Sequence, residues 1–444
     1  MEKSKKIPKS LLFLWPSRAI SYGVASILLG YVSYYATDFM GISMFAAGII
    51  FMLSKIFDGF TDIVAGYIID KTNSKLGKGR PYELALIGYW LFIVILFSAP
   101  EMGVKTSYVY LFVTYTMINS VFLTFLNCNE PVYLSNAIDD SSQSVTILSI
   151  TGFVSMIATM AASMILPQYV QTIGATKEGW RIMAIAMAIP FTLLGLLRFA
   201  TVKEKKRNAV AVTEKITLKQ MVKTLLSNKY ILLFSIIILI SNLGSNLVGT
   251  VTTYYFRYII GDLSKASIMG LSMLAIIIVI VLTPVLSQKF GFVNVIRTTT
   301  LIGMIGYFAK ILFPTNVMFL FIANIFSMLG FYTMFSFAGT FVIDCIDYGE
   351  WKEGIRSEGI ISCSQSVTAK IGTAIGAGVV GVVVGMAGYD GAAAVQNIAT
   401  KNTIIAMYSI VPGIFCLIQF ILLRVYDLDK KLPEIREDLA KRRA

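Results

Sequence analysis

The chain has 444 residues, of which 56% are hydrophobic and 14% are charged, and its net charge is +13. Soluble proteins carry about 25% charged residues, so this composition excludes an ordinary soluble enzyme, a disulfide-rich secreted protein and a disordered chain. The positive charges lie in short clusters between long apolar runs. This pattern indicates a membrane protein and argues against a nucleic-acid partner.

Cysteine and histidine point to no metal or disulfide chemistry. The cysteines lie in apolar stretches without the paired spacing of a metal site or the rhythm of a disulfide framework, so we expect them to pack. The chain has no histidine, so any proton transfer must fall on carboxylates. We expect no cofactor beyond a coupling ion, and no metal other than an alkali cation.

Apolar stretches long enough to cross a membrane, roughly 20 residues each, occur about twelve times. They cover residues 12–38, 43–69, 82–100, 107–134, 144–168, 180–201, 230–259, 266–287, 294–313, 317–346, 360–387 and 402–426. The longest polar segment, at residues 202–229, lies between the sixth and the seventh stretch. We therefore predict one six-helix half at 1–201, a basic linker at 202–229, a second half at 230–426 and a tail at 427–444.

The distribution of Lys and Arg predicts the orientation. Most of these residues lie at the N-terminus, in the linker, in the tail and in alternate loops, whereas the intervening loops hold few. Positive residues stay on the cytoplasmic side, so both termini and the linker are expected in the cytoplasm of a cell-membrane protein.

Two six-helix halves joined by a cytoplasmic linker describe the major facilitator architecture, an all-α integral membrane fold with twelve transmembrane helices. A twelve-helix channel or a membrane enzyme would share this hydropathy. The function therefore has to be inferred from the polar residues inside the spans.

The second span carries Lys55, Asp58 and Asp62 at spacings that place them on one helical stripe. A charged Asp at mid-membrane costs about 2.5 to 3.5 kcal/mol, so a positive partner is expected. Carboxylates and the Thr61 hydroxyl are hard oxygen ligands, which suit Na⁺ or a proton. The alternative is a static Lys55–Asp58 ion pair, with Asp62 bonded to a neighbouring helix.

Two charged segments could form a cytoplasmic gate. The segment DKTNSKLGKGRP follows the second span, and its acid and arginine could pair across the closed gate, or it could simply set the orientation. The segment DYGEWKEGIRSEG could form weak, breakable salt bridges, or it could be a solvated loop. The predicted gate residues are Lys55, Asp70, Gly77, Arg80, Asp347, Glu350 and Arg356.

The runs DGFTDIVAGYIIDKTNSKLGKGRP and IDYGEWKEGIRSEGI, with the lysine of SVTAKIG, resemble the glycoside-pentoside-hexuronide:cation symporters. The resemblance extends over nearly the whole chain. It implies that Asp58 and Asp62 are cation-binding acids and that Thr61 stands where sodium-coupled members often have Asn. It also implies that Lys370, with Gln365 upstream, lies near both the cation and the sugar. From the residues alone, Lys370 could instead reach the membrane interface.

The chain departs from the melibiose-type pattern at its sugar-binding positions. Tyr22, Asn129 and Val145 stand where such members have two acids and an arginine, so a different sugar is implied. Glu130 could be a substitute sugar ligand, a partner of Lys370 or an acid near the cytoplasmic end.

Sugar recognition needs hydrogen-bonding groups and aromatic faces, although most aromatic residues in such a chain face lipid or pack. Asn242 and Asn246 share a stripe with Gly244 and Gly249, which we expect to allow close helix approach. The predicted substrate-binding residues are Tyr22, Asn129, Glu130, Tyr133, Asn242, Asn246, Phe335, Gln365 and Lys370.

These observations predict a monomeric transporter that moves a sugar or glycoside with Na⁺ or H⁺ by alternating access. A transporter of a non-sugar amphiphile such as a lysolipid is the main alternative. A membrane-embedded enzyme is less favoured, because the sequence contains no nucleophile–base constellation and no phosphate-binding motif.

Overall fold

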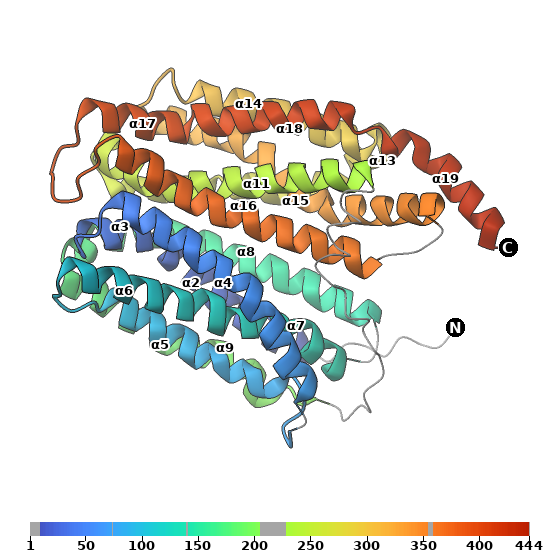
Figure 1. Ribbon diagram of the computed structural model, residues 1–444, viewed down its shortest axis with the longest axis horizontal. Coiled ribbons are helices and arrows are strands. Elements are labelled where there is room, and N and C mark those ends of the chain that lie inside the picture. The colour runs from blue at the N-terminus through green and yellow to red at the C-terminus, as the bar shows by residue number, and fades with distance from the viewer. Residues whose placement is uncertain (1–8, 73, 139–140, 205–227, 354–357, 444) are drawn as a thin grey trace. The chain divides into compact units, whose positions relative to one another are not determined.

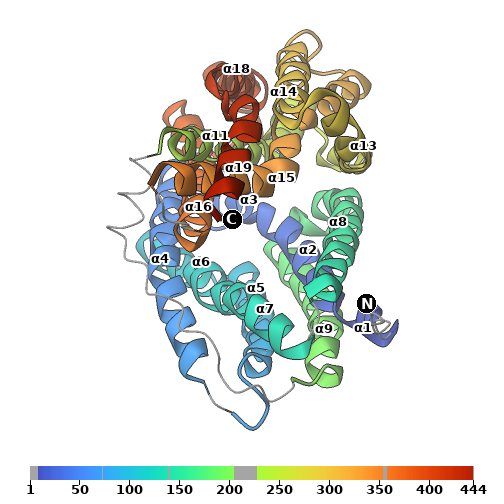
Figure 2. The same ribbon diagram turned by 90° about the vertical axis from the view of Figure 1, so that its right-hand side faces the viewer.

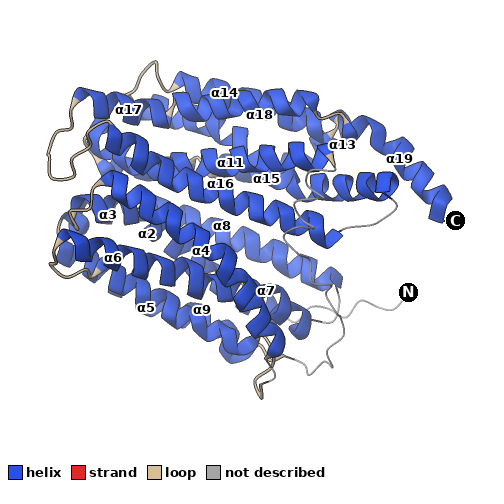
Figure 3. Cartoon of the chain, viewed as in Figure 1, coloured by secondary structure: helices blue, strands red, loops and turns tan. Residues whose placement is uncertain are grey.

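The computed structural model describes residues 9–72, 74–138, 141–204, 228–353 and 358–443. These residues form helices joined by turns and short loops, and no β-strand occurs within the described ranges (Figure 3). The linker predicted at 202–229 lies largely outside them, as does Arg356.

The first part of the chain forms the helices of the predicted N-terminal half (Figure 1). Their bounds are α1 Lys9–Leu14, α2 Ser17–Gly30, α3 Val32–Asp38, α4 Met44–Lys71, η1 Arg80–Leu84, α5 Ala85–Phe97, α6 Val104–Thr116, η2 Met117–Leu123, α7 Thr124–Ala137, α8 Ser141–Thr172, η3 Ile173–Ala175 and α9 Lys177–Thr201.

The remaining helices follow the linker. Their bounds are α11 Lys229–Tyr255, η4 Phe256–Ile260, η5 Leu263–Ala266, α12 Ser267–Leu271, α13 Leu274–Phe290, α14 Phe292–Ala309, α15 Val317–Glu353, α16 Glu358–Met386, α17 Ile398–Tyr408, α18 Ile410–Val425 and α19 Leu428–Arg443.

Ten helices within the described residues are long and apolar enough to cross a membrane. Two further apolar stretches, Met44–Lys55 and Leu263–Ile278, are shorter. The first of these ends where the charged stripe of α4 begins. The all-α multi-pass membrane fold is thus confirmed, with ten full-length apolar helices where the sequence predicts twelve.

The chain divides into two compact units. The first contains residues 1–210, 262–270 and 389–396, and the second contains the rest. In the first unit α2 packs on α8 and α9, α5 packs on α9, and α4 packs on α6 and α7 (Figure 2). An aromatic cluster surrounds the fully buried Trp180 in this unit, and the indole stacks on Phe97 with 5.2 Å between ring centroids.

In the second unit α11 packs along α16, and α14 packs along α15 and α18. The approach of α11 and α16 requires glycine, because a Cβ on Gly372 or Gly376 would lie 2.5 Å from a carbonyl oxygen of α11. Gly244 allows the close approach of α15, because a Cβ there would lie 2.4 Å from the Phe331 ring. A Cβ on Gly249 would meet no atom of another described segment within 4 Å, so the close approach expected there is not seen.

The predicted polar tail is a helix, α19, which lies beside α15 (Figures 1 and 2). Its apolar side chains Leu428, Leu432, Ile435 and Leu439 are buried in the core of the second unit. The tail is therefore a packed part of this unit.

Candidate cation and substrate site

The charged stripe of α4 is centred on Asp58, which is buried. Its Oδ2 accepts a hydrogen bond from Lys55 Nζ at 3.1 Å, and its Oδ1 accepts one from the Ser120 hydroxyl. Lys55 Nζ also lies 3.5 Å from Asn119 Oδ1. The Lys55–Asp58 pair considered from the sequence is therefore formed, and a second helical segment supports it.

Asn119 and Ser120 belong to η2, a π-helical turn within the predicted fourth span. Such turns are rare and often occur at functional sites. Neither residue was among the predicted site residues, although two adjacent polar residues in the middle of a membrane span are a signal that points to them. Asn119 and Ser120 face α4 because η2 packs on α4, a tertiary contact that residue spacing alone does not predict.

Thr61 and Asp62 lie one turn beyond Asp58 on the same helix. The Thr61 hydroxyl lies 3.1 Å from the Phe57 carbonyl oxygen and 3.2 Å from that of Asp58, so its proton is used within α4. Its lone pairs remain able to bind a cation. Both side chains are partly buried, and their role in cation binding stays a prediction.

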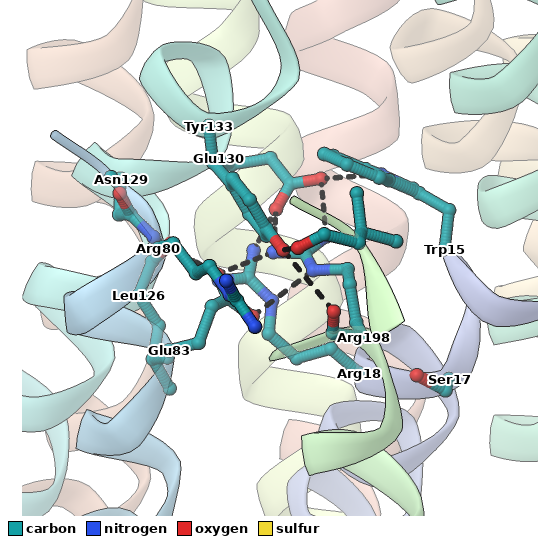
Figure 4. A network of polar contacts seen from close by, with 12 residues as sticks. Trp15, Ser17, Arg18, Arg80, Glu83, Leu126, Asn129, Glu130, Tyr133 and Arg198 are labelled. Atoms are coloured by element: carbon teal, nitrogen blue, oxygen red, sulfur yellow. Dashed lines mark hydrogen bonds and ion pairs between the residues drawn. The ribbon is translucent and has the colours of Figure 1, made fainter. Parts of the chain in front are cut away.

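A second cluster joins four helical segments through two arginines and two glutamates (Figure 4). Arg198 donates to Glu83 at 2.6 and 3.0 Å and to Glu130 at 2.7 and 3.0 Å. Arg18 donates to Glu83 at 3.1 Å and also pairs with Glu130. Two positive and two negative charges therefore compensate one another. We call these four residues the charge cluster.

Neighbouring side chains complete the charge cluster (Figure 4). The Asn129 amide donates to Glu83 at 2.9 Å, and the Trp15 indole donates to Glu130 at 3.1 Å. The Tyr133 hydroxyl lies 2.8 Å from the Val202 carbonyl oxygen, and its ring lies beside the Arg198 guanidinium. Asn129, Glu130 and Tyr133, predicted to bind sugar, thus have protein partners in this structure.

The loop after α4 is organised by Glu204, which sequence analysis did not identify. Its carboxylate accepts hydrogen bonds from the backbone N–H groups of Lys78 at 2.6 Å and Gly79 at 2.7 Å, and also from that of Arg80. Gly77 has a φ of +115°, and a Cβ there would clash with the Glu204 carboxylate. Glycine at this position allows both the backbone conformation and the approach of the acid.

The predicted pairing of Arg80 with Asp70 stays a prediction, because only the Arg80 side chain is described. The Arg80 guanidinium donates to the Phe199 carbonyl oxygen at 2.8 Å and lies over the Phe199 ring, on α9. The side chain of Asp70 is outside the described part of the structure. Arg80 thus joins the end of α9 to the loop within one unit.

Asp347 lies within α15, and Arg436 of α19 donates to it at 2.8 Å and to Asp344 at 3.1 Å. Glu350 lies one turn further along α15, whereas Arg356 is outside the described residues. Asp347, the first acid of the predicted gate segment, is therefore paired with the C-terminal helix α19.

The substrate residues predicted in the second unit lie mainly on α11 and α16. The amide of Asn246 donates to the Asn242 carbonyl oxygen at 2.8 Å and lies 3.4 Å from the Thr373 hydroxyl. Gln365 and Lys370 lie on α16, and both are partly buried. Phe335 on α15 packs against the buried cluster of Tyr307, Phe331 and Cys416. Tyr22, on α2 of the first unit, is 41% exposed.

Comparison with protein families gives one match that spans almost the whole chain. The family model described as "MFS/sugar transport protein" matches residues 18–430. The isoprimeverose transporter of Lactiplantibacillus pentosus is 30% identical over 430 residues, which cover 94% of this chain and 88% of the relative. A protein of Escherichia coli (strain K12) with the provisional name of glycoside/cation symporter is 25% identical, over 96% of this chain and 95% of its own.

Solved structures resemble the chain in fold. The D-xylose-proton symporter has a TM-score of 0.63 at 15% identity, over 92% of this chain and 96% of its own. The nucleoside transporter NupG, as its D323A mutant, has a TM-score of 0.67 at 15% identity, over 94% and 98% of the two chains. Both comparisons support the fold class predicted from hydropathy.

Proposed function

Because the chain belongs to the MFS/sugar transport protein family, we propose that it is a secondary active transporter that carries a sugar or glycoside together with Na⁺ or H⁺. The observation that carries the proposal is the stripe of Lys55, Asp58 and Asp62 on α4. Ionisable groups at membrane depth are costly, and they commonly mark ion pathways. The proposed function contains no covalent step.

A disaccharide that contains xylose is the substrate class that we favour. The relative that is 30% identical is an isoprimeverose transporter, and its similarity covers 94% of this chain. The residues that would contact the sugar remain those predicted from the sequence on α2, α7, α11, α15 and α16, of which the three on α7 would have to exchange their partners in and beside the charge cluster for the sugar. Isoprimeverose is accordingly the first substrate to test.

In the proposed cycle, a cation first binds at Asp58 and Asp62 and thereby completes the sugar site. The loaded protein then exposes both ligands to the other side of the membrane. One charge moving through 100 mV supplies about 2.3 kcal/mol, and a tenfold cation gradient supplies about 1.4 kcal/mol. Together they would support an accumulation of several hundredfold.

The proposed setting is the cell membrane, with both termini in the cytoplasm and one chain as the functional unit. The clusters of Lys and Arg in alternate loops support this orientation.

The test is uptake of isoprimeverose by proteoliposomes with and without gradients of Na⁺ or H⁺. Asp58→Asn and Asp62→Asn should each abolish accumulation against a gradient, because they remove the charge that binds the coupling ion. Asp262→Asn is the matched control, since Asp262 caps η5 outside the stripe and Asn can also cap a helix. Full cation-driven accumulation by either stripe variant would refute the assignment.

A further inference from the structure

We propose that the Lys55 ammonium occupies the cation site when the coupling ion is absent, and that the incoming monovalent cation displaces it. Lys55 would then determine the affinity of the transporter for its coupling ion. This inference rests on the proposed function, since it assumes that Asp58 binds that ion.

Asp58 has a donor on each of its two carboxylate oxygens. The Ser120 hydroxyl holds Oδ1 and lies 3.1 Å from the Ser54 carbonyl oxygen, within the contact between α4 and η2. Lys55 Nζ holds Oδ2 at 3.1 Å. Because packing holds Ser120 while Lys55 extends on a flexible stem, a cation that reaches Asp58 meets the ammonium as its competitor.

A second acceptor is available to the displaced ammonium. Asn119 Oδ1 lies 3.5 Å from Lys55 Nζ, and the Asn119 amide donates to the Tyr115 carbonyl oxygen at 3.0 Å. That bond holds the amide oxygen on the side of Lys55. An ammonium has three donors, so Lys55 can leave Asp58 for Asn119 without losing its proton.

The Lys55–Asp58 pair is formally neutral, with one positive and one negative charge. A monovalent cation that takes the place of the ammonium at Asp58 keeps that carboxylate compensated, as a charge in the apolar interior of a membrane requires. If Lys55 were absent, Asp58 would have no tethered competitor, so it would attract a cation more strongly and release it less readily.

The experiment compares Lys55→Met, Lys55→Arg and the control Lys71→Met in the purified full-length protein. Lys71 lies at the C-terminal end of the same helix, with its ammonium over the ring of Tyr67. Thermal unfolding is followed in detergent without sugar while NaCl replaces choline chloride at constant ionic strength. The readout is the Na⁺ concentration that gives half of the maximal stabilisation.

Loss of the competitor should lower the half-saturating Na⁺ concentration at least tenfold in Lys55→Met, whereas Lys71→Met should match the wild type. Lys55→Arg keeps a tethered cation with a better carboxylate geometry, so its half-saturating concentration should equal or exceed that of the wild type. If Na⁺ does not stabilise the wild type, the same titration is made with protons. The midpoint should then rise by at least one pH unit in Lys55→Met.

An unchanged or raised half-saturating concentration in Lys55→Met would overturn the proposal and establish a static ion pair. If Lys55→Met does not fold, a half-saturating concentration in Lys55→Arg clearly below that of the wild type would overturn it, and one equal or higher would support it. Isoprimeverose uptake by the wild type is measured separately. Failure of that uptake in every cation gradient would count against the proposed function, while the sugar-free titration still decides the role of Lys55.

Discussion

Arg198 and Glu83 are each only 1% exposed, so their charges are almost completely removed from solvent. A buried charge is tolerated only when opposite charges and hydrogen bonds compensate it. The guanidinium satisfies both requirements, because it donates two bonds to each of two carboxylates and lies over the Trp15 ring. The charge cluster thereby joins α2, η1, α7 and α9 of the first unit.

Replacing Arg198 with Met should lower the free energy of unfolding by about 3 to 5 kcal/mol, because Glu83 and Glu130 then share a single arginine. The measurement is denaturant or thermal unfolding of the purified protein in detergent. Arg181→Met on the same helix is the control. Arg181 and its partner Glu178 are 52% and 57% exposed, so we expect a change of at most about 1 kcal/mol there. Equal stability of the two variants would contradict the account of the charge cluster.

The roles of Asn129, Glu130 and Tyr133 show what residue spacing cannot reveal. Polar side chains on one span are equally compatible with a sugar site and with an internal ion network. In the structure Arg198 reaches Glu130 from 68 positions further along the chain. No local sequence pattern indicates a partner so far along the chain. The sequence therefore shows that these residues are polar and lie within a span, but it does not show what they contact.

Among the elements, α19 is a helix in a segment for which the sequence predicted only a tail. Its buried residues, Leu428, Leu432, Ile435 and Leu439, recur at helical spacing. That periodicity is present in the sequence, although the segment was predicted only as a cytoplasmic tail after the last span. The charged side chains of α19 lie on the opposite face of the helix or form ion pairs. Arg436, for example, pairs with Asp344 and Asp347.

Shortening one buried side chain of α19 tests whether this helix is part of the folded second unit. Leu432→Ala should lower the free energy of unfolding by about 2 kcal/mol or more, because it leaves a cavity in a packed core. The exposed neighbour Glu434→Ala should change it by at most about 0.5 kcal/mol. The measurement is thermal unfolding of both variants. A Leu432→Ala protein as stable as the wild type would show that the packing of α19 does not contribute to the stability of the second unit.

The loop between α4 and η1 is the second element whose sequence signal was incomplete. Gly77 and Gly79 favour a tight turn in this loop, and Gly77 does adopt a positive φ. The acid that the turn receives, Glu204, lies beyond the sixth predicted span, 126 positions from Lys78. The turn was predictable because φ preference is local, whereas its partner depends on where α9 ends.

For the whole molecule, the charge distribution makes a prediction about topology that helix geometry alone does not. Lys105 lies in the first turn of α6, at an end expected outside, whereas Lys75 follows α4 in a loop expected in the cytoplasm. Both side chains are exposed. In intact cells a membrane-impermeant maleimide should label Lys105→Cys but not Lys75→Cys. Both should react after permeabilisation. The opposite pattern would invert the proposed orientation, and labelling of both in intact cells would contradict the assigned spans.

Hydropathy and short motifs are enough to assign the class of this protein. Long apolar runs predict helices in a membrane, because a backbone in lipid must satisfy its own hydrogen bonds. The major facilitator architecture was predicted from hydropathy and the sugar symporter family from motifs, and the match to a sugar-transport family model confirms this membership. Those properties are local or additive along the chain. Only the tertiary structure decided that Ser120 and Asn119 face the α4 stripe, that Asn129, Glu130 and Tyr133 surround two arginines, and that α19 packs on α15. These are contacts between distant segments, whose energies depend on which helices pack together.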